Sequence, residues 1–106
     1  MAKNRGDVPP LPQIDAFLHE LARLRLLTFL SVLKRADFVY LLRHSGLSRG
    51  NLSVQMTKLS DAGLVNIDKS FVDNRPRTTY SLTREGRAKL AVYKSEMTTL
   101  LDALPG

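Results

Sequence analysis

Two glycines in the middle of the chain constrain its fold more than any other feature of the sequence. Asp37 is a favourable N-cap, and apolar residues follow it at helical spacing until Gly46, where a helix can end in a left-handed residue. Ser48 is a second N-cap two positions later, and its helix continues through about Ala62, just before Gly63. The pattern predicts a short helix, a tight glycine turn and a longer helix, which together form a helix-turn-helix.

After the second glycine, the spacing of apolar residues changes from about 3.6 to two. Alternation extends, with one interruption, from Val65 to Phe71, and returns from Thr78 to Leu82. Residues 73–76 between them read Asp-Asn-Arg-Pro, which is turn chemistry. We therefore expect a β-hairpin with a charged tip directly after the helix-turn-helix.

Helical patterns flank this region on both sides. From Ile14 to about Lys34 apolar residues recur every three or four positions, and the second half is apolar on almost every side, which predicts the centre of the core. Thr83 is the N-cap of a last helix that ends before Pro105. The expected fold class is therefore mainly α with a β-hairpin wing (α+β), the winged helix-turn-helix plan.

The length of 106 residues allows one ordinary domain. Residues 1–13 are expected to be a flexible N-terminal arm, because three prolines prevent a helix there. Lys3 and Arg5 in this arm are possible phosphate contacts, although a solvated tail is the reading we favour. The winged helix-turn-helix domain is expected over residues 14–106, with a recognition helix at about 48–62, a wing at about 64–82 and a C-terminal helix at about 83–104.

Composition narrows the class of partner. Sixteen Lys and Arg against ten Asp and Glu give a net charge of +6, and most of the surplus lies between residues 38 and 90. A small basic domain points to a polyanionic partner. The longest uncharged apolar stretch, Leu26 to Leu33, is too short to cross a bilayer, and no secretion signal is recognised. With no cysteine in the chain either, we expect a cytoplasmic protein without membrane contact.

Short motifs run through the helix-turn-helix and the hairpin in a consistent order. They are Phe38…Leu41 with Leu47-Ser48, Gly50-Asn51-Leu52-Ser53, Lys58-Leu59…Ala62-Gly63-Leu64-Val65, Lys69…Phe71, Arg75-Pro76-Arg77-Thr78…Tyr80 and Leu82-Thr83…Glu85-Gly86-Arg87. From Asp15 to about Tyr93 the chain resembles the winged-helix transcriptional regulators of the MarR/ArsR type, above all the small branch with one winged helix per chain. The resemblance implies a homodimer, joined by N- and C-terminal dimerisation helices, on a pseudo-palindromic site in double-stranded DNA.

The first helix departs from the pattern of this family. Members often have a proline a few residues after the first-helix histidine, ahead of an Arg-Leu pair, whereas residues 19–24 here read His-Glu-Leu-Ala-Arg-Leu. Without a proline to bend it, we expect the first helix to be unbroken from Ile14.

The helix that follows Ser48 has a polar face suited to a major groove. Leu52, Met56 and Leu59 must face the core, which leaves amide, hydroxyl and cationic groups on the other side. Asn or Gln can bond adenine through two atoms, and Val54 can meet a thymine methyl group. The alternative is an ordinary solvated helix face. The candidate major-groove residues are Ser48, Arg49, Gly50, Asn51, Ser53, Val54, Gln55 and Lys58.

The hairpin supplies the second candidate DNA contact. An arginine at the tip of a wing gains from the negative potential of a narrow minor groove, and a proline beside it stiffens the loop. Solvent exposure alone also explains a charged hairpin tip. The candidate wing residues are Lys69, Asn74, Arg75, Arg77 and Thr78.

Two apolar stripes are candidates for a dimer interface. The stripe on the last helix has coiled-coil spacing, and the stripe on the first helix is short, so the two together would form one shared interface. The alternative is that both stripes cover their own domain. The candidate interface residues are Ile14, Phe17, Leu18, Leu21, Leu90, Tyr93, Met97, Leu100 and Leu104.

The sequence contains few residues that indicate a metal, catalytic or cofactor site. His19 and His44 lie on different predicted helices, so we expect no metal site, and no acidic pair, phosphate loop or Ser-His-Asp set indicates an enzyme or a cofactor. The alternative function is a winged helix used as a protein–protein interaction module. RNA binding is disfavoured because no exposed aromatic pair is predicted for base stacking. A small-molecule effector is compatible with the sequence, which specifies no pocket for one.

Overall fold

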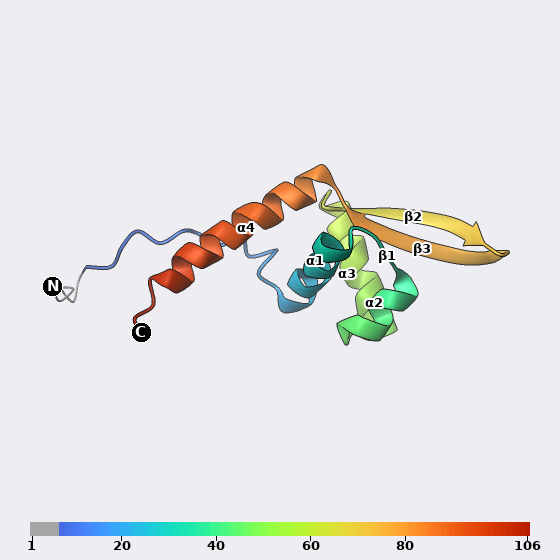
Figure 1. Ribbon diagram of the computed structural model, residues 1–106, viewed down its shortest axis with the longest axis horizontal. Coiled ribbons are helices and arrows are strands. Elements are labelled where there is room, and N and C mark those ends of the chain that lie inside the picture. Colours follow the sequence, from blue (N-terminus) through green and yellow to red (C-terminus); the bar gives the residue numbers. More distant parts are fainter. Residues whose placement is uncertain (1–6) are drawn as a thin grey trace.

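The computed structural model describes residues 7–106 and forms a winged helix (Figure 1). Lys3 and Arg5, the arm residues considered for phosphate contact, lie outside the described residues. None of the helices within residues 7–106 is long and apolar enough to span a membrane. In chain order the elements are α1 (Leu21–Leu33), β1 (Ala36–Asp37), α2 (Phe38–Ser45), α3 (Arg49–Asp61), β2 (Val65–Val72), β3 (Arg75–Leu82) and α4 (Arg84–Asp102).

The helix-turn-helix has the predicted caps. The Asp37 side chain accepts a hydrogen bond from the backbone N–H of Tyr40 at 2.7 Å, and α2 ends at Gly46, whose φ is 78°. The hydroxyl of Ser48 accepts from the N–H of Asn51 at 3.1 Å and begins α3. Both N-caps and the glycine turn are therefore confirmed.

The wing is an antiparallel hairpin with a shorter turn than the sequence predicts. Val72 pairs with Arg75, so only Asp73 and Asn74 form the turn, and both have a positive φ, of 52° and 63°. A two-residue turn of this hand matches the twist of the strands. Arg75 and the proline after it belong to β3. The prediction of a four-residue turn at 73–76 is therefore wrong, because the turn contains only residues 73 and 74.

A third strand completes the sheet, in the order β1-β3-β2. Ala36 pairs with Tyr80 and Asp37 with Thr79, so the start of the helix-turn-helix is joined to the base of the wing. Two residues are too few to show a period-two pattern, and the sequence analysis missed this strand.

The first helix is not unbroken from Ile14, and this prediction is wrong. The carboxylate of Asp15 accepts hydrogen bonds from the N–H groups of Phe17 and Leu18 at 2.9 and 3.2 Å, which closes a separate turn. Glu20 is then extended, with φ −94° and ψ 126°, and its side chain caps α1 by accepting from Arg23 N–H. Two acidic caps therefore interrupt the predicted helix.

The core lies between α1, α2, α3 and the base of the sheet. The second half of α1 supplies its centre, because Leu26, Leu27 and Leu30 are fully buried. The prediction that this half is buried on every side is wrong, because Val32 and Leu33 are 73% and 38% exposed. Leu41 of α2 and Leu59 of α3 are also fully buried. The wing and α4 project from this core in opposite directions (Figure 1), and the molecule measures 67 × 25 × 20 Å. Its radius of gyration, 17.5 Å, exceeds the value of about 13 Å typical of a compact domain this size.

The start of α4 is held tightly against the end of α3. The hydroxyl of Thr83 donates to the Gly63 carbonyl at 2.7 Å and accepts from the Gly86 N–H at 2.8 Å, which caps α4 as predicted. The Thr83 N–H donates to the Leu64 carbonyl at 3.0 Å. Gly86 lies directly against that same carbonyl, so a side chain has no room there.

Candidate nucleic-acid interface

The exposed side of α3 carries most of the residues expected to face a major groove. Ser48, Arg49, Gly50, Asn51, Ser53, Val54 and Lys58 are all exposed. Leu52, Met56 and Leu59 are buried on the opposite side, as the helical spacing predicts. No carboxylate lies between residues 49 and 58, so this surface of α3 presents donors, hydroxyls and cations to an incoming anion.

Gln55 is the member of this set that the structure places elsewhere. Its side chain is buried, with 8% of its surface exposed. The Oε1 atom of Gln55 accepts from Arg23 Nη1 at 3.0 Å, and its Nε2 atom donates to Asn51 Oδ1 at 3.3 Å. Gln55 therefore lies beneath the exposed face and supports Asn51.

A groove of about 490 Å³ joins the start of α3 to the wing. Its lining includes three arginines, and Arg49 is shared with the exposed face of α3. The Arg49 guanidinium lies 5.3 Å from the centre of the Phe38 ring, which orients it. One carboxylate, Asp37, lies among these cations. The lining residues are Asp37, Phe38, Val39, Arg49, Val72, Arg75, Pro76, Arg77 and Thr78.

Arg77 forms an ion pair with Asp37, the N-cap of the helix-turn-helix. Its guanidinium donates to Asp37 Oδ2 through Nη2 at 2.9 Å and through Nε at 3.3 Å. Arg75 forms no ion pair with any residue in the described range 7–106. The two wing arginines therefore differ, because one is braced against α2 and the other is free for an external anion.

The pKa of Asp37 is lowered from its ordinary value of 3.8, first by the hydrogen bond from the Tyr40 N–H and then by Arg77, while burial opposes the shift. A lowered pKa in the folded state adds stability above the unfolded pKa, and this stability is lost as pH falls through the folded value. We expect the stability difference between the wild type and Asp37→Asn to shrink below about pH 4. Asn also caps helices, so the variant isolates the charge.

Urea denaturation of both proteins between pH 7 and pH 3 measures this difference. A difference that stays constant over the whole range would contradict a stabilising role for the Asp37 charge.

The remaining wing residues lie along the strands and at the turn. Lys69 and Asn74 are exposed, and Thr78 is partly buried opposite Lys69 in the strand register.

The sequence did not predict a role for two further arginines. Arg35 reaches the sheet, where its guanidinium forms an ion pair with Asp68 at 3.3 Å and donates a hydrogen bond to the Thr79 hydroxyl at 3.0 Å. Sequence reasoning also missed Arg23 beneath α3, because no local pattern marks a cation that contacts a helix far along the chain.

The candidate dimer residues divide into two groups. Leu18 and Tyr93 are buried in the core of their own chain, and Ile14, Phe17, Leu90 and Met97 are partly buried against it. Leu100 is partly buried, while Leu21 and Leu104 are 69% and 66% exposed.

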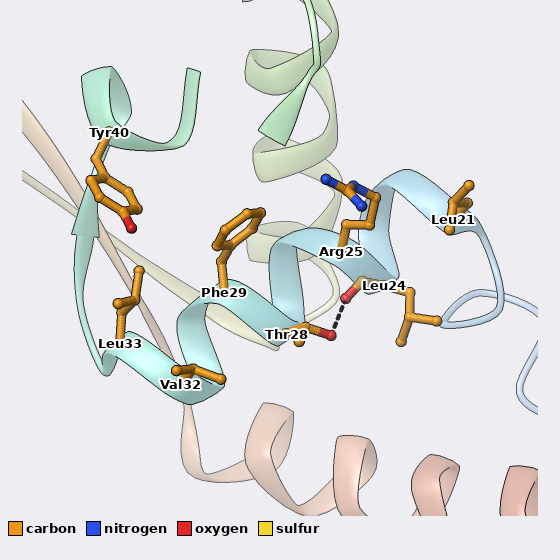
Figure 2. A pocket seen from close by; sticks show the side chains of 8 residues that line it. All are labelled: Leu21, Leu24, Arg25, Thr28, Phe29, Val32, Leu33 and Tyr40. Atoms are coloured by element: carbon orange, nitrogen blue, oxygen red, sulfur yellow. Dashed lines mark hydrogen bonds between the residues drawn. The ribbon is translucent and has the colours of Figure 1, made fainter. Parts of the chain in front are cut away.

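An apolar hollow of about 470 Å³ lies on the outer side of α1 (Figure 2). Seven of its residues come from α1, and Tyr40 of α2 closes one end. The Thr28 hydroxyl donates to the Leu24 carbonyl at 2.8 Å, so Arg25 is its main polar group. The lining residues are Leu21, Leu24, Arg25, Thr28, Phe29, Val32, Leu33 and Tyr40.

This hollow continues into a second one, of about 560 Å³, between α1 and α4. Leu24, Thr28 and Val32 line both. Val32 is 73% exposed and Leu101 of α4 is 54% exposed. We call the two hollows together the α1 face.

The two histidines have neighbours of other kinds. His19 Nδ1 lies 2.8 Å from the hydroxyl of Tyr93, which joins the turn before α1 to α4. The ring of His44 lies 4.3 Å from that of Tyr40. In residues 7–106 no three His, Asp or Glu side chains gather in a way that could hold a metal ion.

Two comparisons of the sequence find proteins that are similar to this chain. The model of a family described as winged helix DNA-binding domain matches residues 22–101. An uncharacterized protein of Methanocaldococcus jannaschii is 30% identical over 82 residues, which cover 77% of this chain and 89% of that protein.

Solved structures give the same result. A transcriptional regulator homologue from Pyrococcus horikoshii OT3 is 29% identical with a TM-score of 0.80, over 85% of this chain and 89% of that one. A MarR family transcriptional regulator from Silicibacter pomeroyi is 30% identical with a TM-score of 0.64, over 80% of this chain and 56% of that one. The predicted winged-helix fold and the resemblance to MarR-type regulators are confirmed.

Proposed function

The chain belongs to the winged helix DNA-binding domain family, and from this premise we propose that it is a homodimeric transcriptional regulator that reads a specific sequence in double-stranded DNA. DNA binding and the regulator type follow from the family and the MarR-like neighbours. Homodimerisation, sequence specificity and the roles of individual residues are what the proposal adds.

One observation supports the proposal above all others. The carboxylate-free face of α3 continues through Arg49 into the groove that holds Arg75 and Arg77. A duplex whose major groove receives α3 would then carry its phosphate backbone along the groove towards the wing. Phosphate contacts there supply affinity without regard to sequence, and side chains on α3 supply selectivity.

Affinity for a generic duplex across a salt series tests DNA binding directly. We expect log affinity to fall steeply with log salt, with a slope that corresponds to on the order of six to ten phosphate contacts per dimer. Alanine at Arg75 or Arg77 should make the slope shallower by about one per chain. A flat response that also tolerates both substitutions would favour the protein–protein interaction module.

The homodimer is proposed to form through the α1 face. One winged helix offers few base contacts, so a two-fold pair on a pseudo-palindromic site would double them. The α1 face is apolar and continuous, and the extended shape of the chain leaves both α1 and α4 accessible to a second copy. Large exposed apolar surfaces on a small protein commonly mark an interface.

Val32→Asp should convert the dimer into a monomer, because it places a charge at the junction of the two hollows and an unpaired buried charge is costly. Sedimentation velocity at micromolar concentration measures the change. Val72→Asp is the matched control, since Val72 is also an exposed valine but lies on the wing, and it should remain dimeric. An unchanged dimer in Val32→Asp would move the interface away from the α1 face.

A further inference from the structure

Three side chains form a chain of hydrogen bonds from α1 to the exposed face of α3. Arg23 Nη1 donates to Gln55 Oε1 at 3.0 Å, and Gln55 Nε2 donates to Asn51 Oδ1 at 3.3 Å. Arg23 is itself held in place, because its Nε donates to the Phe17 carbonyl at 2.8 Å and its guanidinium stacks 4.3 Å from the centre of the Phe17 ring. The chain therefore begins at a rigid cation and ends at an exposed amide.

The chemistry of these groups gives the chain one direction. A guanidinium only donates hydrogen bonds, so the Gln55 atom next to Arg23 must be the amide oxygen. The other end of the Gln55 amide is then the NH₂ group, which only donates. The Asn51 atom that faces it must therefore be oxygen. Arg23 thus decides which way the Asn51 amide points, through Gln55.

We propose, on the basis of the proposed DNA-binding function, that Arg23 and Gln55 are positioning residues that make Asn51 a donor in the major groove. With its oxygen turned toward the buried Gln55, Asn51 presents its NH₂ group outward. Guanine offers two acceptors in the major groove and cytosine offers only a donor. The Asn51 position of the site should therefore prefer guanine over cytosine. The two-atom adenine contact expected from the sequence needs the oxygen outward and is replaced by this contact.

Gln55→Glu reverses the direction of the chain and tests the inference. A carboxylate accepts from Arg23 with one oxygen, and its other oxygen also accepts, so Asn51 must turn its NH₂ group inward and its oxygen outward. The preference should shift from guanine to a base with an exposed donor, cytosine or adenine, by roughly tenfold in relative affinity. The new ion pair with Arg23 should keep the variant folded, which thermal denaturation checks.

The readout is the base preference of the site, obtained by selection from a randomised duplex library followed by sequencing. The relevant position is the one whose preference is lost in Asn51→Ala. Gln55→Glu also adds a negative charge near the DNA. This charge should lower affinity for every duplex to the same extent, so it cannot by itself produce a change in base preference. Gln55→Met removes both hydrogen bonds and should broaden the preference without reversing it, and the double variant with Asn51→Ala should show no reversal.

A guanine preference in the wild type that reverses in Gln55→Glu supports the inference. An adenine or cytosine preference in the wild type, or an unchanged preference in a Gln55→Glu protein that still binds its site, overturns the inference alone. If the wild-type chain binds no duplex at all, the proposed function fails and the inference fails with it.

Discussion

Asn51→Ala should weaken binding to the selected DNA site by about 1–3 kcal/mol, roughly 5- to 150-fold, and should change binding to an unrelated duplex very little. Asn51 is exposed on α3, and its amide is held by Gln55 before DNA arrives. A held side chain loses little conformational freedom on binding, so most of its hydrogen-bond energy contributes to discrimination. Fluorescence anisotropy with both duplexes at one salt concentration measures the two losses.

The N-cap of α3 does not depend on the Asn51 side chain. The N-cap bond at this position joins the backbone N–H of Asn51 to Ser48 and is retained in the variant. Thr57→Ala is the matched control on the same face, because the Thr57 hydroxyl already donates to the Ser53 carbonyl at 3.0 Å. It should leave both affinities within about twofold. Equal losses on both duplexes in Asn51→Ala would remove Asn51 from base reading.

Gly86→Ala should destabilise the fold by about 1–3 kcal/mol, which lowers Tm by roughly 5–20 °C. A Cβ atom at Gly86 would overlap the Leu64 carbonyl group. That carbonyl is backbone and accepts a hydrogen bond from the Thr83 N–H at 3.0 Å, so it cannot move without loosening the cap of α4. Differential scanning calorimetry measures the change.

Gly50→Ala is the control, because it makes the same chemical change on another helix. Nothing lies within 4 Å of a Cβ at Gly50. Alanine is the better helix former by roughly 0.5–1 kcal/mol, so this variant should be more stable than the wild type. If both variants shifted Tm in the same direction, the change of Tm in Gly86→Ala could not be attributed to overlap of the new Cβ atom with the Leu64 carbonyl.

Local signals in the sequence predicted most of the fold. Asp37, Ser48 and Thr83 each cap a helix through a hydrogen bond to a residue three positions later, and Gly46 ends α2 in the left-handed conformation. Each signal depends on a few neighbouring residues, and the backbone satisfies it wherever the segment lies. The break before α1 belongs to the same class, since Glu20 caps Arg23 three positions later, but continuous apolar spacing concealed it.

The candidate site was predicted less completely. The exposed residues of α3 follow from helical spacing, because the core must take Leu52, Met56 and Leu59. Gln55 lies on this same stripe, three positions after Leu52 and next to Met56. Spacing alone therefore indicates its burial. Its polar chemistry favoured a surface assignment, because the buried partner that it needs was not visible in the sequence.

The sequence by itself determined the N-caps of α2, α3 and α4, the glycine turn between α2 and α3 and which face of α3 is polar, because those properties depend on residues a few positions apart. Only the tertiary structure decided that Gln55 bonds Arg23, 32 positions away, and that Arg77 bonds Asp37, 40 positions away. Such pairs form when packing brings distant segments within about 3 Å. Their physical cause is the shared core of α1, α3 and the sheet, which sets the direction of Asn51 and the position of the wing.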